Sequence, residues 1–230
     1  QWTDLKAMAT AGKISSFKIT DATKPTLTLS TADLSNSTAL MGKIAAVTTL
    51  KVSDTSANIA SNLDQLQAQA AKLASIEQSG TKAALGITAA QLKSAAAALA
   101  KIDAGSYTLA VTGVNAATLA TVQANTKVTS FSFTDTSANI ALKLDALQLA
   151  GDKLTSVSQS GVKTALAITA AQLSADSATL AKIDASTDVP YTLSVSGIKI
   201  QDLKDITANS KITSFSVNDS ATNVASALSD

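Results

Sequence analysis

Three aspartates stand at matching positions along the chain and are the first candidates for a chemical role. Asp54, Asp135 and Asp219 each follow a run rich in Val, Ser, Thr or Phe and precede a Ser-containing segment with helical spacing. Such carboxylates can accept hydrogen bonds from the free N–H groups of a helix's first turn, or bind a cation through several oxygen ligands. No second oxygen-rich set accompanies them, so the pattern favours helix capping over metal binding.

Five lysines open successive segments of the chain and would form a basic edge if those segments were stacked. Such an edge would attract an anionic polysaccharide. The alternative is a solvated corner, in which nearby aspartates such as Asp152 offset the charge. The five residues are Lys13, Lys72, Lys127, Lys153 and Lys211.

The composition argues against an enzyme. The 230 residues include no His, no Cys and no Arg, and Glu77 is the only Glu. The commonest general base, the commonest metal ligand and the best thiol nucleophile are therefore missing. We expect no catalytic residues, no cofactor and no bound metal.

Charge and hydropathy limit the partners and the kind of core. The formal net charge of +1 gives no drive toward nucleic acids or anionic membranes. The Ala-rich run from Ser94 to Ala100 is far shorter than the ~20 residues that a membrane span needs. Aromatic residues make up only 3% of the chain, which favours thin stacked layers of Ala, Leu, Ile and Val over one thick core.

The elements that position these residues repeat with a period of 81 residues. A segment beginning at Val47 reads VTTLKVSDTSANIA; it returns at Val128 as VTSFSFTDTSANIA and, 84 residues later, at Ile212 as ITSFSVNDSATNVA. A second segment begins at Lys72 as KLASIEQSGTKAALGITAAQL and returns at Lys153 as KLTSVSQSGVKTALAITAAQL. Self-similarity at a fixed spacing is typical of solenoids, in which each repeat covers the apolar face of the next.

Each long unit divides into three kinds of strand–helix turn. The first kind has a strand at Val128 to Thr134 and a helix at Ser137 to Ala150. The second kind has short strands near Leu154 to Val157 and at Ala165 to Thr169, and then a helix. The third kind begins with a strand at Tyr191 to Ser196 and also ends in a helix. Runs of Thr, Val and Phe predict the strands, and apolar residues spaced by three and four predict the helices.

The sequence therefore predicts an α/β solenoid, with residues 1–230 as a single continuous segment. We expect about eight stacked strand–helix turns, with a parallel β-sheet on one face and helices on the other. The first and last turns are incomplete, so we expect the segment to be cut from a longer repeat array.

The strands of the first kind resemble those of leucine-rich repeats. Their apolar residues have the spacing L-x-x-L-x-L, as in Val128, Phe131 and Phe133. This resemblance implies strands that line one face of a solenoid. The same spacing occurs at Ile14, Phe17 and Ile19 and again at Ile212, Phe215 and Val217.

The texture of the whole chain resembles the imperfect-repeat regions of very large secreted or cell-surface bacterial proteins. These regions are rich in Ala, Thr, Ser and Asp, as is the run TSANIA…LDALQ…KLTSV…ITAAQL. The resemblance implies a protein of the adhesin, surface-layer or filament type, placed outside the cell or at its surface.

We therefore expect a structural extracellular repeat protein that forms a stalk, a surface coat or a filament and can assemble end to end. Its expected partners are other copies or neighbouring repeats of the same chain, and surface polysaccharide is a further candidate. The alternative is a binding module or adhesin that recognises a glycan or a protein through the strand face or the lysine edge. Tyr107 and Tyr191, at matching strand starts, would then stack on sugar rings, or else cover the edge of the apolar layer.

Overall fold

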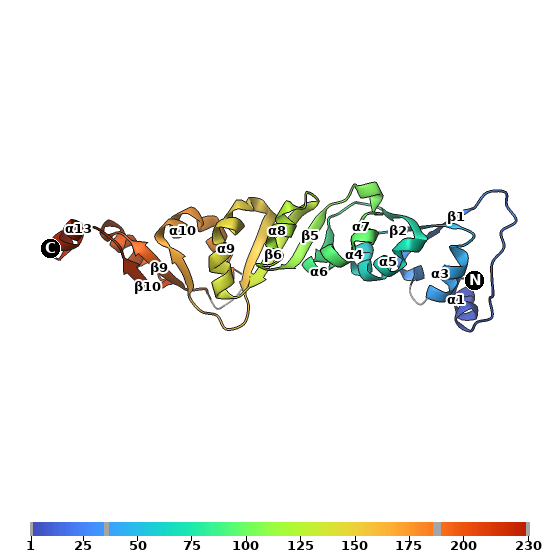
Figure 1. The fold of residues 1–230 in the computed structure, drawn as a ribbon, viewed down its shortest axis with the longest axis horizontal. Coiled ribbons are helices and arrows are strands. Elements are labelled where there is room, and N and C mark those ends of the chain that lie inside the picture. The colour runs from blue at the N-terminus through green and yellow to red at the C-terminus, as the bar shows by residue number, and fades with distance from the viewer. Residues whose placement is uncertain (1, 35–36, 186–189, 229–230) are drawn as a thin grey trace. The chain divides into compact units, whose positions relative to one another are not determined.

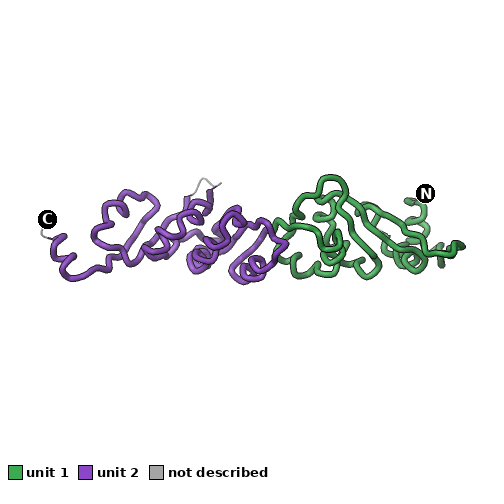
Figure 2. The backbone as a smooth tube through the Cα atoms, turned by 90° about the horizontal axis from the view of Figure 1, so that it is seen from above, with its two compact units in different colours: residues 1–111 green, residues 112–230 purple. Residues whose placement is uncertain are grey.

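Strands alternate with helices along the whole described chain (Figure 1). The computed structural model describes residues 2–34, 37–185 and 190–228. Its strands form three sheets that are all parallel, which confirms the predicted α/β architecture of strand–helix units. The backbone divides into two compact units, residues 1–111 and 112–230, which Figure 2 colours separately. The continuous solenoid stays a prediction.

The first unit contains a parallel sheet in the order β1-β2-β3. Leu50 of β2 pairs with Leu73 of β3, and Val52 pairs with Ile76, so apolar side chains of neighbouring strands line up in rows. The strands are β1 (Thr26–Leu29), β2 (Thr49–Asp54), β3 (Leu73–Gln78) and β4 (Leu85–Thr88). The α-helices are α1 (Trp2–Thr10), α2 (Thr31–Leu34), α3 (Thr38–Ile44), α4 (Ser56–Ser61), α5 (Leu63–Gln69), α6 (Ala89–Ser94) and α7 (Ala96–Leu99). Two 3₁₀-helices, η1 (Ala70–Lys72) and η2 (Asp103–Gly105), lie beside β3 in the sequence or in space.

The second unit repeats this plan. In it β6 pairs with β7, and β8, β9 and β10 form a further sheet in which β9 is central. The strands are β5 (Leu109–Val114), which crosses the boundary of the units, β6 (Val128–Asp135), β7 (Leu154–Gln159), β8 (Leu166–Thr169), β9 (Leu193–Ile198) and β10 (Ile212–Val217). The helices are α8 (Leu119–Ala124), α9 (Ser137–Leu149), η3 (Gly151–Lys153), α10 (Ala170–Ala175), α11 (Ser177–Leu180), η4 (Ile200–Asp202), α12 (Leu203–Ala208) and α13 (Ala221–Ala227).

Local sequence explains where the helices of the second-kind turns begin. Thr88 accepts a hydrogen bond from the backbone N–H of Gln91, and the Gln91 side chain accepts one from the backbone of Thr88. Thr169 and Gln172 form the same reciprocal capping box at the start of α10. Each strand therefore passes into its helix through a Thr that satisfies the first free N–H groups.

The cores are built from aliphatic side chains with few rings. Phe131 and Phe133 of β6 are buried, and so are small residues such as Ala95 and Ala98 of the helix layer. Small side chains let short helices approach a sheet closely. The expected strands and helices of the first and second turn kinds are confirmed, with ends that differ by one or two residues.

One predicted strand does not form. The spacing of Ile14, Phe17 and Ile19 predicts a strand, but residues 13–20 adopt neither helix nor strand. The backbone of this segment accepts a hydrogen bond from the Lys43 side chain at Ser15 O (3.0 Å), and no strand pairs with it among the described residues. An isolated strand cannot satisfy its own backbone groups, so apolar spacing without a neighbour is not enough.

Candidate functional site

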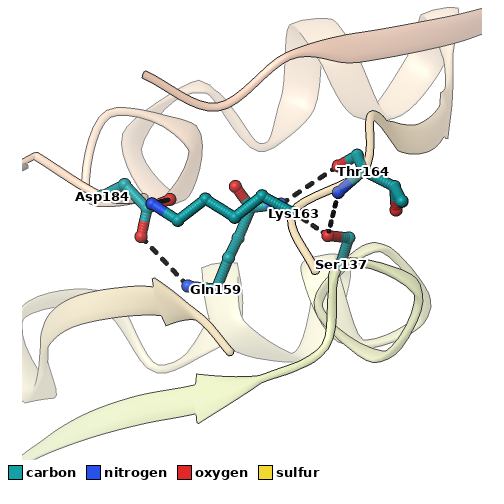
Figure 3. A network of polar contacts seen from close by, with 5 residues as sticks. All are labelled: Ser137, Gln159, Lys163, Thr164 and Asp184. Carbon is teal, nitrogen blue, oxygen red and sulfur yellow. Dashed lines mark hydrogen bonds and ion pairs between the residues drawn. The ribbon is translucent and has the colours of Figure 1, made fainter. Parts of the chain in front are cut away.

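A buried polar network occurs once in each unit, at the place where a first-kind helix meets the end of β3 or β7. In the second unit it joins the start of α9, the end of β7 and the loop before β8 (Figure 3). Its members are Ser137, Gln159, Lys163, Thr164 and Asp184 in the second unit, and Ser56, Gln78, Lys82, Ala83 and Asp103 in the first.

A glutamine stands at the centre of each network. Gln159 Nε2 donates to Ser137 Oγ (2.6 Å) and to Thr164 O (3.1 Å), while the Thr164 N–H donates to the same Ser137 Oγ (3.0 Å). In the first unit Gln78 Nε2 donates to Ser56 Oγ (2.7 Å) and to the carbonyl of the next loop (3.0 Å). The side chain therefore ties the strand, the preceding helix and the following loop together.

An aspartate holds the backbone of the same strand from the other side. Asp184 Oδ1 accepts the Gln159 N–H (3.0 Å), and Oδ2 forms an ion pair with Lys163 Nζ (2.8 Å). Only 1% of the Asp184 side chain is exposed, so its charge needs this partner. Asp103 repeats both contacts with Gln78 N and Lys82 Nζ at the same distances.

Both aspartates adopt a left-handed backbone conformation. Asp103 has φ of 44° and Asp184 has φ of 46°. Asp tolerates this region better than most residues with a Cβ. The turn directs the carboxylate back toward the strand, so the strain accompanies a specific set of hydrogen bonds.

The network has the properties of a structural clamp. Its polar groups are directed mainly at backbone N–H and C=O groups, which a parallel strand at a sheet boundary would otherwise leave unsatisfied. The serine accepts hydrogen bonds and has no neighbouring base within the network that would activate it. One atom, Gln159 Oε1, is buried without a hydrogen-bond partner.

The predicted helix caps lie next to the residues that cap. Thr55, Thr136 and Ser220 are the capping residues of α4, α9 and α13, because each accepts the N–H three residues later. The aspartates stand one position earlier, so the capping role assigned to Asp54, Asp135 and Asp219 is corrected. Their carboxylates are too far back along the chain for that N–H and bind the side chain of an Asn four residues later.

Each of these carboxylates also ties down the backbone of another turn. Asp54 Oδ2 accepts from Thr31 N (2.9 Å) and Oγ1 (2.7 Å). Partial burial raises the pKa of Asp54, but the hydrogen bonds from Asn58, Thr31 and Thr55 outweigh it and lower the pKa to about 2. The sequence identified these aspartates correctly as structural residues that hold N–H groups, but not which ones.

Asp135 and Asp219 have equivalent long-range partners. Asp135 Oδ2 accepts from Ala116 N (2.8 Å), and Asp219 Oδ2 accepts from Ile200 N (2.9 Å). Burial raises the pKa of Asp135, yet the hydrogen bonds, that from Ala116 first, lower it overall. The pKa of Asp219 is lowered, chiefly by the Ile200 N–H.

The five lysines of the predicted basic edge have separate roles where contacts are described. Lys72 Nζ donates to Gln69 Oε1 (3.0 Å), and Lys211 Nζ lies 4.0 Å from the ring centre of Tyr191. Lys127 and Lys153 directly precede the paired strands β6 and β7, and Lys13 precedes the segment without strand structure. A continuous ribbon across the units stays a prediction.

A second carboxylate pair is particular to the second unit. Asp176, between α10 and α11, is buried and has an Oδ2 atom without a hydrogen-bond partner. Burial, followed by the hydrogen bond and charge of Asp145, raises the pKa of Asp176 to about 6. The corresponding residue of the first unit is the buried Ala95, so the repeat does not need this carboxylate.

A hollow of about 560 Å³ borders the network of the first unit. Its charged lining residues already pair with one another: Lys51 with Glu77 at 3.8 Å, and Lys82 with Asp103 at 2.8 Å. Among the described residues no group of three or more carboxylates is arranged to hold a metal ion. None of the helices in the described ranges is long and apolar enough to cross a bilayer.

The sequence pattern contained a signal for the networks that apolar spacing does not reveal. Gln-Ser-Gly-x-Lys occurs at residues 78–82 and 159–163, and Lys-Ile-Asp occurs at residues 101–103 and 182–184, both 81 residues apart. Polar residues repeated at a fixed spacing between apolar strands indicate a repeated buried contact. Comparisons with protein-family models, with curated proteins and with solved structures found no match.

Proposed function

We propose that this chain is a structural repeat protein, built as an α/β solenoid of about eight turns, and not an enzyme. Its proposed role is that of a stalk, surface coat or filament component. The observation that carries the proposal is the second copy of the buried network, which repeats the first in residue types and in distances. A repeated set of contacts that hold backbone groups supports a mechanical role, because a catalytic or binding site needs one place where reactive groups remain available.

The topology supports stacking of the turns. In both units a first-kind strand pairs in parallel with the following second-kind strand, with the same register. The aspartates after β2, β6 and β10 each bind the N–H of another turn, so neighbouring turns are joined by polar contacts as well as by apolar packing. In a solenoid of this type, stability is the sum of such nearest-neighbour contacts.

We place the protein outside the cell or at its surface, on the composition and the resemblance to large exported repeat proteins. The absence of Cys means that its folding depends on no disulfide in that environment. Surface polysaccharide remains a candidate partner. Tyr191 is less favoured as a sugar-stacking residue, because it is 6% exposed and lies under Lys211.

Small-angle X-ray scattering on the purified chain tests the proposed solenoid. A stacked array predicts an asymmetric distance distribution with a long tail and a cross-section much smaller than the maximum dimension. A globule of this length would have a radius of gyration of about 17 Å. A symmetric distribution at that radius would contradict the solenoid. A glycan array on the same sample tests the binding alternative, which a saturable, Lys153-dependent signal would favour.

A further inference from the structure

The outer edge of β10 is open. β10 ends its sheet, and on that edge no strand pairs with it among the described residues. Phe215 is 42% exposed and Val217 is 43% exposed. The corresponding residues of β6, Phe131 and Phe133, are 2% and 0% exposed. The apolar pattern of β10 is therefore one that is fully buried in the preceding repeat.

The repeat shows which strand covers this edge elsewhere. β3 lies beside β2, and β7 lies beside β6. In the second unit Phe131 pairs with Leu154 and Phe133 with Val157. The slot beside β10 therefore calls for the first strand of a second-kind turn.

Residues 14–19 belong to this class of strand. KISSFKIT from Lys13 aligns with KLTSVSQS from Lys153. The Lys43 side chain donates to Ser15 O (3.0 Å), as Lys182 donates to Leu154 O (2.6 Å) one residue further back in the alignment. The segment thus sits in a second-kind turn, but the strand itself does not form.

The capping residues of the following helix support this alignment. The Ser30 N–H donates to Asp33 Oδ2 (2.9 Å), and the Asp33 N–H donates to Ser30 Oγ (3.2 Å). Thr169 and Gln172 make the same reciprocal contacts before α10. Residues 13–34 are therefore a second-kind turn, with one residue inserted relative to residues 153–173.

Three substitutions match each other across the two open surfaces. In the complete turn, the serine at the start of α9 accepts hydrogen bonds from the glutamine at the end of β7 and from the backbone N–H of the next loop. Ala221 stands at the serine position, Ile19 at the glutamine position and Pro25 at the loop position. Ala has no acceptor, Ile has no donor and Pro has no N–H. A junction of Ala221 with Ile19 and Pro25 is therefore apolar on both sides and leaves no polar group of the network unsatisfied.

We infer that residues 14–19 of one copy add as a parallel strand to the outer edge of β10 in a second copy of this chain. The register of β6 and β7 places Phe17 beside Val217, Ile14 beside Phe215 and Ser16 beside Ser216. The contact is head to tail, so it leaves one free head and one free tail and can continue along a line of copies. This inference rests on the proposed function, since it names the partner of the structural repeat.

Cysteine cross-linking tests the register in a chain that has no Cys of its own. One sample carries Ser16→Cys and a second carries Ser216→Cys, and the two are mixed under mild oxidation. We expect a covalent dimer that forms about tenfold faster than with Ser214→Cys, a control two residues away on the same strand. Equal rates for the two pairs would overturn the register.

Complementary variants test the contact itself. Phe17→Glu disables the head and leaves the tail intact, whereas Val217→Glu disables the tail and leaves the head intact. By sedimentation velocity we expect concentration-dependent oligomers of the wild type, monomers of each variant and dimers of their equimolar mixture. Circular dichroism melts of the variants serve as the folding control. A wild type that stays monomeric up to millimolar concentration, or variants that still self-associate, would overturn the inference.

The two proposals fail in different ways. A monomeric wild type that still scatters as an elongated particle removes the head-to-tail contact and leaves the proposed structural function in place. A rounded particle contradicts the solenoid whatever its association state.

Discussion

Residues 13–44 and residues 153–183 are two versions of the same second-kind turn, and only the second version forms its first strand. Both have the apolar spacing of that strand, and in both a lysine near the end of the turn reaches its backbone. They differ in the buried clamp: Ile19 replaces Gln159, and Ala45 replaces Asp184. Only the complete version also has a first-kind strand, β6, beside it. The comparison indicates that clamp and neighbour together hold the strand, and that apolar spacing alone does not.

The first way to break this comparison is to give the complete turn the residue of the incomplete one. Gln159→Leu removes two side-chain hydrogen bonds and leaves Thr164 O buried without them. We expect a loss of about 3 kcal/mol in the free energy of unfolding of the second unit. Urea denaturation followed by circular dichroism measures it. Gln201→Leu, at an exposed position, is the matched control and should change stability by less than about 0.5 kcal/mol.

A double variant sharpens the same point. Gln159→Leu combined with Ser137→Ala reproduces the apolar pair seen at Ile19 and Ala221. We expect the double variant to recover about 1 kcal/mol relative to the sum of the single changes, because no donor or acceptor of the side-chain pair is left unmatched. Strictly additive effects would show that the glutamine and serine do not act as a pair.

The ion pair of the clamp should matter next. Lys163→Met leaves the Asp184 carboxylate buried without its cation, and we expect a loss of about 2 kcal/mol. Lys82→Met in the first unit should cost less, because the Lys82 side chain is 55% exposed against 32% for Lys163. Thermal melts of both variants give the comparison, and an equal or reversed order would contradict it.

Asp176 offers a change of opposite sign. Its raised pKa means that the folded state binds this proton more tightly than the unfolded state, so the free energy of unfolding falls as pH rises from about 4 to about 6. Asp176→Ala, the residue found in the first unit, should add about 1.5 kcal/mol at pH 7 and nothing at pH 3.5. Urea titrations at the two pH values measure the gain. A variant that is destabilised at pH 7 would contradict the interpretation.

The smallest expected effect concerns Asp54. Its lowered pKa gives a stabilisation that is complete above pH 4 and is lost as pH falls toward 2. Asp54→Asn should therefore cost about 1 kcal/mol at pH 7, after allowance for solvent screening, and nothing near pH 2. Thermal melts between these pH values check the sign. A loss that persists at pH 2 would mean that the carboxylate charge is not what stabilises the turn.

The alternation of strands and helices could be predicted from the sequence, because the 81-residue repeat and the apolar spacing act locally. The clamps could not be predicted in this way. Gln159, Ser137 and Asp184 lie far apart in the chain and meet only when parallel strands have paired. The failed strand at residues 14–19 has the same cause, since its apolar residues satisfied the spacing rule while its backbone lacked a neighbour.

Hydrogen exchange at each amide of the dilute chain tests the central claim, that the clamp and a neighbouring strand hold the first strand of a second-kind turn. We predict slow exchange in residues 73–78 and 154–159, and exchange on the order of a hundredfold faster in residues 14–19. Equal protection of all three segments in a monomeric sample would contradict the claim, because residues 14–19 would then form their strand with neither.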